Sequence, residues 1–315
     1  MAKKNKINNL LSRQVVILDG AAGTELQKRG MPAGACPEIW CLENKEVISG
    51  MHASYRKSGA HILYTCTFGA NRFKLRQYGA QNDTYAINRE LARTARKAGG
   101  AKTLIAGDIG PTGLFIEPFG SLPFEEALEA FQEQARGLID GGCDLIVIET
   151  MIDIQEARAA LLAVKELGDI FTAVSMTYEK DGHTLGGTPP AAALITLQSL
   201  GADVVGCNCS AGPEQMVDFI TEMRPFATVP LLAKPNAGMP RLDGVKTVFD
   251  MDARTFAGHC RKLVRAGASL VGGCCGTTPE HITALVGAAG GKKPPVPRRA
   301  SLAALSSARG FVHLE

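Results

Sequence analysis

Eight short apolar runs, each followed by a stretch with helical spacing, constrain the fold of this chain more than any other feature. They lie at residues 15–20, 62–68, 103–110, 145–150, 171–178, 203–210, 231–238 and 270–277. Most are continuous and not alternating, which is typical of parallel strands covered on both faces. Strand and helix alternating eight times predict an α/β fold, a (β/α)8 TIM-type barrel with parallel strands.

The segments between the runs support this interpretation. Residues 123–142 carry apolar side chains on one stripe, with Pro123 suited to the first turn. Residues 153–167 and 252–266 each begin with an aspartate suited to the N-cap. The alternative is a doubly wound sheet, which usually has fewer strands and a nucleotide-binding loop. The turn at residues 20–23 lacks the G-x-G-x-x-G spacing of such a loop.

A barrel also fits the length of the chain, because 315 residues with 45% apolar composition can bury one large core. We expect residues 1–14 to form an N-terminal extension and residues 15–290 to form the barrel. Residues 291–315 are expected to form a C-terminal tail or linker, since the run KKPPVPRR is followed by small and polar residues.

Charge and composition narrow the classes of partner. The net charge is +3, and no basic patch with interleaved aromatic residues is present, which argues against nucleic acid. The sequence contains no run of 18 apolar residues, so it predicts no membrane-spanning helix. The basic N-terminus lacks the apolar core of a secretory signal. We therefore expect a cytoplasmic protein. Its nine cysteines are expected to be buried residues or metal ligands, not disulfides.

Polar and thiol side chains gather where the predicted strands end. These positions are Asp19-Gly20, Cys66-Thr67, Asp108, Glu149-Thr150, Asn208-Cys209, Asn236 and Cys274-Cys275. The carboxyl ends of the strands form the active-site face of a β/α barrel. The sequence therefore predicts a functional site at this end of the barrel.

Three of these thiols have the character of zinc ligands. Cys209 lies in VVGCNCSAG, and Cys274 and Cys275 lie in LVGGCCGTTPEH, so both runs are apolar strands that end in thiols. Glycines beside Cys274 and Cys275 permit the bend that turns two neighbouring side chains toward one metal. Three thiolates leave the fourth position of Zn²⁺ open. Water or the Asn236 carbonyl could fill that position in the resting state.

An open position on zinc predicts a particular chemistry. A substrate thiol that enters it loses its proton, because the metal makes the thiolate the stable form near neutral pH. The site would then activate a sulfur nucleophile for alkylation. A fourth protein ligand would instead close the site, and Cys207, Cys66 and His281 are the candidates. The non-enzyme alternative is therefore a barrel with a closed structural zinc site, or a redox dithiol at Cys274-Cys275.

A further pattern, D-x-H-x-x-G at residues 181–186, matches the way in which some corrinoid proteins supply a histidine to cobalt. It has only three fixed positions and follows the fifth predicted strand, where turn residues are expected. We therefore do not assign cobalamin binding to this loop.

Seven motifs together resemble one known family. They are ILDGAAGTELQKRG (17–30), TFGANRFKL (67–75), GDIGPTG (107–113), IVIETMID (146–153), GCNCSAGPEQ (206–215), KPNAGMP (234–240) and GGCCGTTPEH (272–281). They occur in order over nearly the whole chain. The chain resembles the homocysteine S-methyltransferases, most closely the N-terminal homocysteine-binding module of cobalamin-dependent methionine synthase.

The resemblance implies roles for individual residues. It implies a β/α barrel in which Cys209, Cys274 and Cys275 bind zinc. Asp19 and Gly20 match the positions that hold the amino acid part of homocysteine, and Glu149 matches the position that receives its ammonium group. A carboxylate is a natural partner for an ammonium ion. One departure is Cys66, which stands where the family usually has asparagine.

The resemblance also implies a reaction, the transfer of a methyl group to L-homocysteine to form methionine. The implied donor is methylcobalamin, presented by a corrinoid domain or protein in cis or in trans. The alternative is a stand-alone thiol methyltransferase that uses S-methylmethionine, betaine or another donor. A betaine site would call for an aromatic cage, and a chain whose single tryptophan is Trp40 offers little for one.

Overall fold

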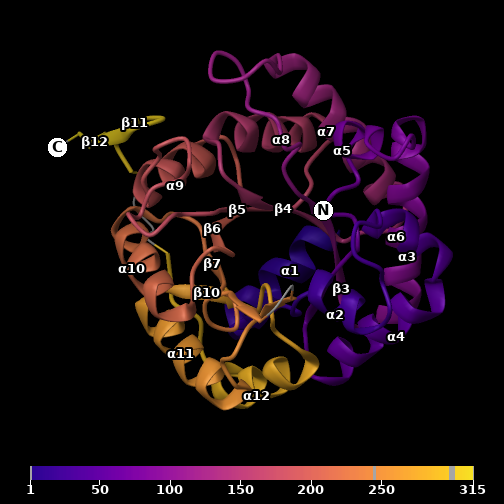
Figure 1. Cartoon of the computed structure of the whole chain (residues 1–315). Coiled ribbons are helices and arrows are strands. Elements are labelled where there is room, and N and C mark those ends of the chain that lie inside the picture. The colour runs from indigo at the N-terminus through magenta and orange to yellow at the C-terminus, as the bar shows by residue number, and fades with distance from the viewer. Residues whose placement is uncertain (1, 244–245, 298–301, 315) are drawn as a thin grey trace.

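Each of the eight predicted runs supplies one strand of a single parallel sheet in the computed structural model (Figure 1), which describes residues 2–243, 246–297 and 302–314. The strands are β1 (Val16–Ile17), β2 (Ile62–Tyr64), β3 (Leu104–Ile109), β4 (Leu145–Met151), β5 (Thr172–Met176), β6 (Val204–Asn208), β7 (Leu231–Lys234) and β10 (Ala268–Val271). Their order in the sheet is β1-β10-β7-β6-β5-β4-β3-β2. A parallel bridge between Leu18 and Ile62 joins the two edges. The prediction of a (β/α)8 barrel is confirmed.

Most of the helices form a ring around the strands, whereas α1 lies inside this ring (Figure 1). The helices are α1 (Ala2–Arg13), α2 (Gly23–Lys28), α3 (Pro37–Glu43), α4 (Lys45–Lys57), α5 (Arg72–Arg76), α6 (Thr84–Gly99), α7 (Phe124–Asp140), α8 (Ile154–Glu166), α9 (Pro190–Ser199), α10 (Pro213–Met223), α11 (Ala253–Ala266) and α12 (Pro279–Ala289), with short 3-10 turns at Gln81–Asp83 and Arg224–Phe226. Asp153 and Asp252 cap α8 and α11 through their side chains, as predicted. Pro123 is the N-cap residue of α7, one position before the first turn.

Two apolar layers hold the barrel together. Alternate strand residues such as Val16 and Leu270 fill its interior, while their neighbours such as Ile17 and Val271 pack under the helices. Helix α1 adds Ile7 to the interior layer, so the segment expected as an N-terminal extension contains a helix that packs onto the barrel. This packing leaves the opposite, carboxyl end of the strands for the loops that carry the polar residues.

Two antiparallel hairpins lie outside the barrel sheet, and the sequence analysis predicted neither of them. One is β8 (Arg241–Asp243) with β9 (Lys246–Val248), and the other is β11 (Ala304–Ser307) with β12 (Gly310–His313). The second lies outside the ring of helices beside α9 (Figure 1), where the rings of Phe311 and Phe226 have centroids 4.7 Å apart. Residues 298–301 and 315 of the expected tail lie outside the described residues. Among the described helices, none is long and apolar enough to cross a membrane.

Candidate metal and substrate site

A cavity of about 400 Å³ opens at the carboxyl ends of the strands, where the sequence predicted a site. Asp19, Asp108 and Glu149 line it at or near the ends of β1, β3 and β4, and α3 adds a fourth carboxylate, Glu38. Thiols from the loops after β6 and β10 line the same cavity. The cavity therefore has carboxylates on one side and thiols on the other.

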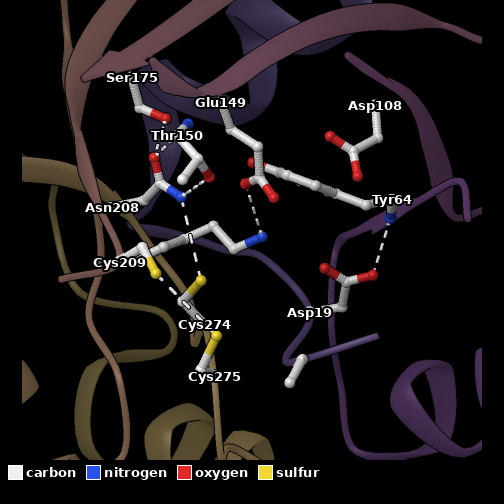
Figure 2. A network of polar contacts seen from close by, with 12 residues as sticks. Asp19, Tyr64, Asp108, Glu149, Thr150, Ser175, Asn208, Cys209, Cys274 and Cys275 are labelled. Carbon is white, nitrogen blue, oxygen red and sulfur yellow. Dashed lines mark hydrogen bonds and ion pairs between the residues drawn. The ribbon is translucent and has the colours of Figure 1, made fainter. Parts of the chain in front are cut away.

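The three predicted zinc ligands converge at this cavity (Figure 2). The sulfur atoms of Cys209, Cys274 and Cys275 all lie within 4.8 Å of one another, and those of Cys209 and Cys275 are 3.9 Å apart. Hydrogen bonds from the other two thiols, that of Cys274 first, lower the pKa of Cys209. In the described part of the chain this is the only group of three or more histidine, cysteine or acidic side chains close enough to hold a metal ion.

The backbone on both sides is shaped for this convergence. Cys209 and Ser210 have φ angles of 60° and 48°, a left-handed conformation that is uncommon for residues other than glycine. After β10, the Cys274 N–H donates to the Pro235 carbonyl at 2.8 Å. A Cβ atom on Gly273 would lie 2.4 Å from the Thr277 hydroxyl, so only glycine fits this bend. The glycine-assisted bend inferred from the sequence is therefore present.

None of the candidate fourth ligands Cys207, Cys66 and His281 belongs to the group of three side chains that lie within 4.8 Å of one another. Cys207 belongs to the layer of side chains under the helices. Two positions further on, Cys209 lines the cavity, because its left-handed backbone breaks the alternation of the strand. The ring nitrogens of His281 form hydrogen bonds with the Thr278 hydroxyl and with the Met251 carbonyl. Cys66 lines the cavity, but its sulfur faces the His52 ring at 4.0 Å.

Asn236, predicted as a resting-state ligand, has a buried side-chain oxygen without a hydrogen-bond partner among the described residues. Its backbone N–H donates to the Ala211 carbonyl at 3.2 Å, which ties the end of β7 to the loop after β6. Asn236 is not among the residues that line the cavity, and its role as a ligand stays a prediction.

Glu149 forms a buried ion pair that the sequence analysis did not foresee. Its carboxylate lies 3.2 Å from the ammonium group of Lys234, and both residues are buried. The same ammonium group sits 3.5 Å from the centre of the Tyr64 ring, within cation–π distance. Burial alone would lower the pKa of Lys234, but Glu149, Tyr64 and Asp19 outweigh it and hold the pKa well above its ordinary value. Lys234 therefore carries a positive charge.

Asp19 and Gly20 lie where β1 ends, against the neighbouring strand. One carboxylate oxygen of Asp19 accepts the Tyr64 N–H at 2.7 Å, and the other is buried without a partner among the described residues (Figure 2). Burial raises the pKa of Asp19 to about 7, although Lys234 opposes the shift. A Cβ atom on Gly20 would lie 2.7 Å from the Tyr55 hydroxyl oxygen, so close packing requires glycine here.

Asn208 ties the acidic and thiol sides together (Figure 2). Its side-chain oxygen accepts the Thr150 N–H at 2.8 Å and the Ser175 hydroxyl at 2.7 Å. Its amide nitrogen donates to the Thr150 hydroxyl at 2.8 Å and lies 3.9 Å from the Cys274 sulfur. This amide therefore fixes the residue after Glu149 relative to the thiol cluster.

Sequence reasoning noted Asn208 and Asp108 as polar strand ends but did not select them, and it missed Lys234 and Tyr64. A usable signal existed for Lys234, because a lysine that ends the apolar run LLAK is rarely buried without a partner. No such signal existed for Tyr64, whose contact with Lys234 depends on how the barrel closes.

Replacing Asp19 with asparagine should stabilise the metal-free fold increasingly as pH rises. A raised pKa means that the folded native protein favours the protonated form of Asp19. The contribution of Asp19 to the stability of the native protein is therefore full below its unfolded pKa and is lost as pH rises toward about 7. Asparagine carries no charge at any of these pH values and avoids this loss. At one pKa unit per ~1.4 kcal/mol, the gain at pH 8 is at most about 4 kcal/mol. Urea unfolding of both proteins at pH 5 and pH 8 measures it, and an equal difference at both would contradict this account of Asp19.

Comparison with known proteins agrees with this geometry. The family model described as homocysteine S-methyltransferase matches residues 16–289. Methionine synthase of Mycobacterium leprae is 32% identical over 295 residues, 86% of this chain and 24% of that protein. The Mycobacterium tuberculosis enzyme of the same name is 32% identical over 310 residues, 91% of this chain and 26% of that protein. The chain thus spans about a quarter of the length of these relatives.

Among solved structures, the metallated form of the homocysteine methyltransferase MmuM from Escherichia coli has a TM-score of 0.74 and 25% sequence identity. The match covers 88% of this chain and 97% of MmuM. Family model, sequence relatives and structure point the same way, and the chain belongs to the homocysteine S-methyltransferase family.

Proposed function

We propose that this chain is a zinc-dependent homocysteine S-methyltransferase of the methionine synthase type. The homocysteine thiol would accept a methyl group from methylcobalamin held on a separate domain or protein. The observation that carries the proposal is the convergence of Cys209, Cys274 and Cys275 on a cavity that also holds buried carboxylates. A thiol site and an ammonium site in one hollow suit an amino acid that carries both groups.

The residues present fit a zinc ion. Three half-buried sulfur donors within 4.8 Å of one another are a ligand set that zinc accepts. Water or the Asn236 oxygen would complete the set in the resting state. When bound there, zinc would favour the thiolate form of the substrate sulfur near neutral pH. The protein supplies the rest, because Asn208 holds the thiol loop and Gly273 allows its bend.

The acidic side would bind the amino acid part of the substrate. Glu149 and Asp19 are buried carboxylates on the wall of the cavity, and a primary ammonium ion can donate to both. Gly20 lines the same cavity beside Asp19. Ammonium binding at one end would hold homocysteine so that its sulfur reaches the thiol cluster at the other.

The extent of the relatives supports a donor held outside this chain. The chain matches only 24% and 26% of the two mycobacterial methionine synthases. Residues 1–14 would then precede a homocysteine-binding barrel at 15–290, and residues 291–315 would serve as a tail or linker. The match to 97% of MmuM favours a second candidate, a stand-alone methyltransferase with another donor such as S-methylmethionine or betaine.

Zinc-edge X-ray absorption of the reduced, zinc-loaded protein, with and without L-homocysteine, tests the proposal. We expect three sulfur ligands and one oxygen or nitrogen ligand to become four sulfur ligands when homocysteine is added. Four sulfurs in both samples would mean a closed structural site and would overturn the mechanism. Turnover with methylcobalamin, compared with S-methylmethionine and betaine, then separates the two candidate donors.

Replacing Cys209 with alanine should abolish stoichiometric zinc and methyl transfer while the barrel stays folded, because two thiolates hold zinc much more weakly than three. Cys274→Ala and Cys275→Ala should behave alike. The matched control is Cys207→Ala, which removes a thiol two residues away that packs under the helices. Metal analysis after dialysis should give about one zinc per chain for the control and for the native protein. Full zinc in the Cys209 variant would reject the ligand assignment.

Replacing Glu149 with glutamine should weaken homocysteine binding by about 10- to 100-fold and leave zinc in place, because a charged hydrogen-bond acceptor becomes neutral. Calorimetric titration of the zinc-loaded variant measures the affinity, and metal analysis supplies the control. Loss of zinc from this variant would show that Glu149 supports the metal and not the substrate.

A further inference from the structure

A second cavity lies at the amino end of the barrel, the end opposite the thiols. It has a volume of about 370 Å³ and is bounded by α1 and by the residues that lead into β2 and β3. Lys6, Asn9 and Arg13 line it from α1, and Lys102 and Thr103 line it from the loop before β3. None of the described acidic residues lines it. This amino-end pocket therefore carries cations without carboxylates.

The spacing of residues on α1 explains how its polar side chains reach the amino-end pocket. Lys6, Asn9 and Arg13 lie at positions i, i+3 and i+7 of the helix, so they share one face. Ile7 lies on a different face and packs into the barrel interior. The helix thus covers the strands with apolar side chains while its polar face lines the pocket.

The cations of the amino-end pocket lack partners that another cation of the same helix has. Lys4 forms an ion pair with Asp203 at 2.9 Å. In contrast, the side chains of Arg13 and Lys102 make no hydrogen bond or ion pair with any described residue. Lys6 reaches a single backbone carbonyl, at 3.5 Å. The three positive charges are therefore not compensated within the described chain.

Thr103 adds a second, independent observation. Its side chain is part of a residue that is only 7% exposed, yet the hydroxyl has no hydrogen-bond partner among the described residues. Exposed lysines and arginines are well solvated and need no partner, whereas a largely buried hydroxyl favours a group that accepts its hydrogen bond. The pocket therefore combines uncompensated charge with an unused donor in its wall.

His61 forms part of the same wall but adds no charge. Its Nδ1 accepts the Ile17 N–H at 2.8 Å, and its Nε2 lies 3.1 Å from the side-chain nitrogen of Gln14. Burial lowers the pKa of His61 below its ordinary value, so the ring is neutral near pH 7. The charge of the pocket therefore comes from two lysines and one arginine.

A phosphate group matches these donors. A phosphate monoester carries about two negative charges near neutral pH and offers three terminal oxygens. The planar guanidinium group of Arg13 can bind two oxygens at once, with the lysine ammonium groups as point charges beside it. The Thr103 hydroxyl and the Asn9 side-chain amide can donate to the remaining lone pairs. A single carboxylate would bring only one negative charge to three cations.

We propose that the amino-end pocket binds a small molecule that carries a phosphate group. The proposal goes beyond the proposed methyl transfer, because the pocket lies at the other end of the strands and shares no lining residue with the thiol cavity. A bound phosphate would join α1 to the loop before β3. It would therefore stabilise the packing of α1 on the barrel.

Titration of inorganic phosphate into the full, zinc-loaded chain tests the proposal, with the backbone amide signals followed by NMR. We expect saturable shifts centred on Asn9, Lys102 and Thr103. The dissociation constant should be about 1 mM or lower at an ionic strength of about 0.1 M. The amide signals of the thiol loops should stay unchanged, because they lie at the opposite end of the barrel.

The variant Arg13→Gln/Lys102→Gln should bind phosphate about 10-fold more weakly, because it removes two partly exposed charges. The matched control is Arg261→Gln/Lys262→Gln, which also removes one arginine and one lysine. Both of these residues are exposed on α11 and neither lines the pocket. The control should bind phosphate within about twofold of the native protein.

Three results would overturn the proposal. Binding that does not saturate at about 20 mM phosphate would mean that the pocket is not a site. Equal weakening in the pocket variant and in the control would mean that phosphate responds only to net charge. Shifts centred on Cys209, Cys274 and Cys275 would place the phosphate at the metal centre instead.

Discussion

Closure of the parallel sheet is the constraint on which the rest of this structure depends. The bridge between Leu18 and Ile62 joins β1 to β2, and β10 pairs with both β1 and β7. Parallel strands that close into a ring bring all their carboxyl ends to one rim. Asp19 and Cys275, which lie near opposite ends of the barrel sequence, therefore line one cavity.

The buried charges at this rim determine which ligands it can bind. A buried lysine is tolerated because Glu149 and the face of Tyr64 compensate it, yet two further carboxylates remain in the same cluster. Such an excess lowers the stability of the empty protein, which is the usual cost of a preorganised binding site. The thiol side shows the same compromise, since Cys209 and Ser210 adopt a left-handed backbone that side chains disfavour.

Sequence predicted the barrel because continuous apolar runs and helical stripes report burial directly, and it predicted the thiol cluster because cysteines at strand ends are rare. It did not predict the partner of Glu149, since the ion pair with Lys234 spans 85 positions and depends on strand order. Alternation would also place Cys207 and Cys209 on one face of the strand, but the left-handed backbone at Cys209 and Ser210 breaks that pattern. The hairpin of β11 and β12 was missed because short, largely exposed strands carry little apolar signal.

Under the proposed function, the acceptor site would take all its side chains from one barrel. Every side chain assigned to it lies between Asp19 and Cys275, inside the region that matches the family model. That same barrel accounts for 97% of MmuM and for about a quarter of the mycobacterial methionine synthases. Under the proposed function, a site that recognises its acceptor without help from other domains can be combined with different methyl donors. The donor would then be chosen by what reaches the open end of the cavity, and not by the thiols and carboxylates within it.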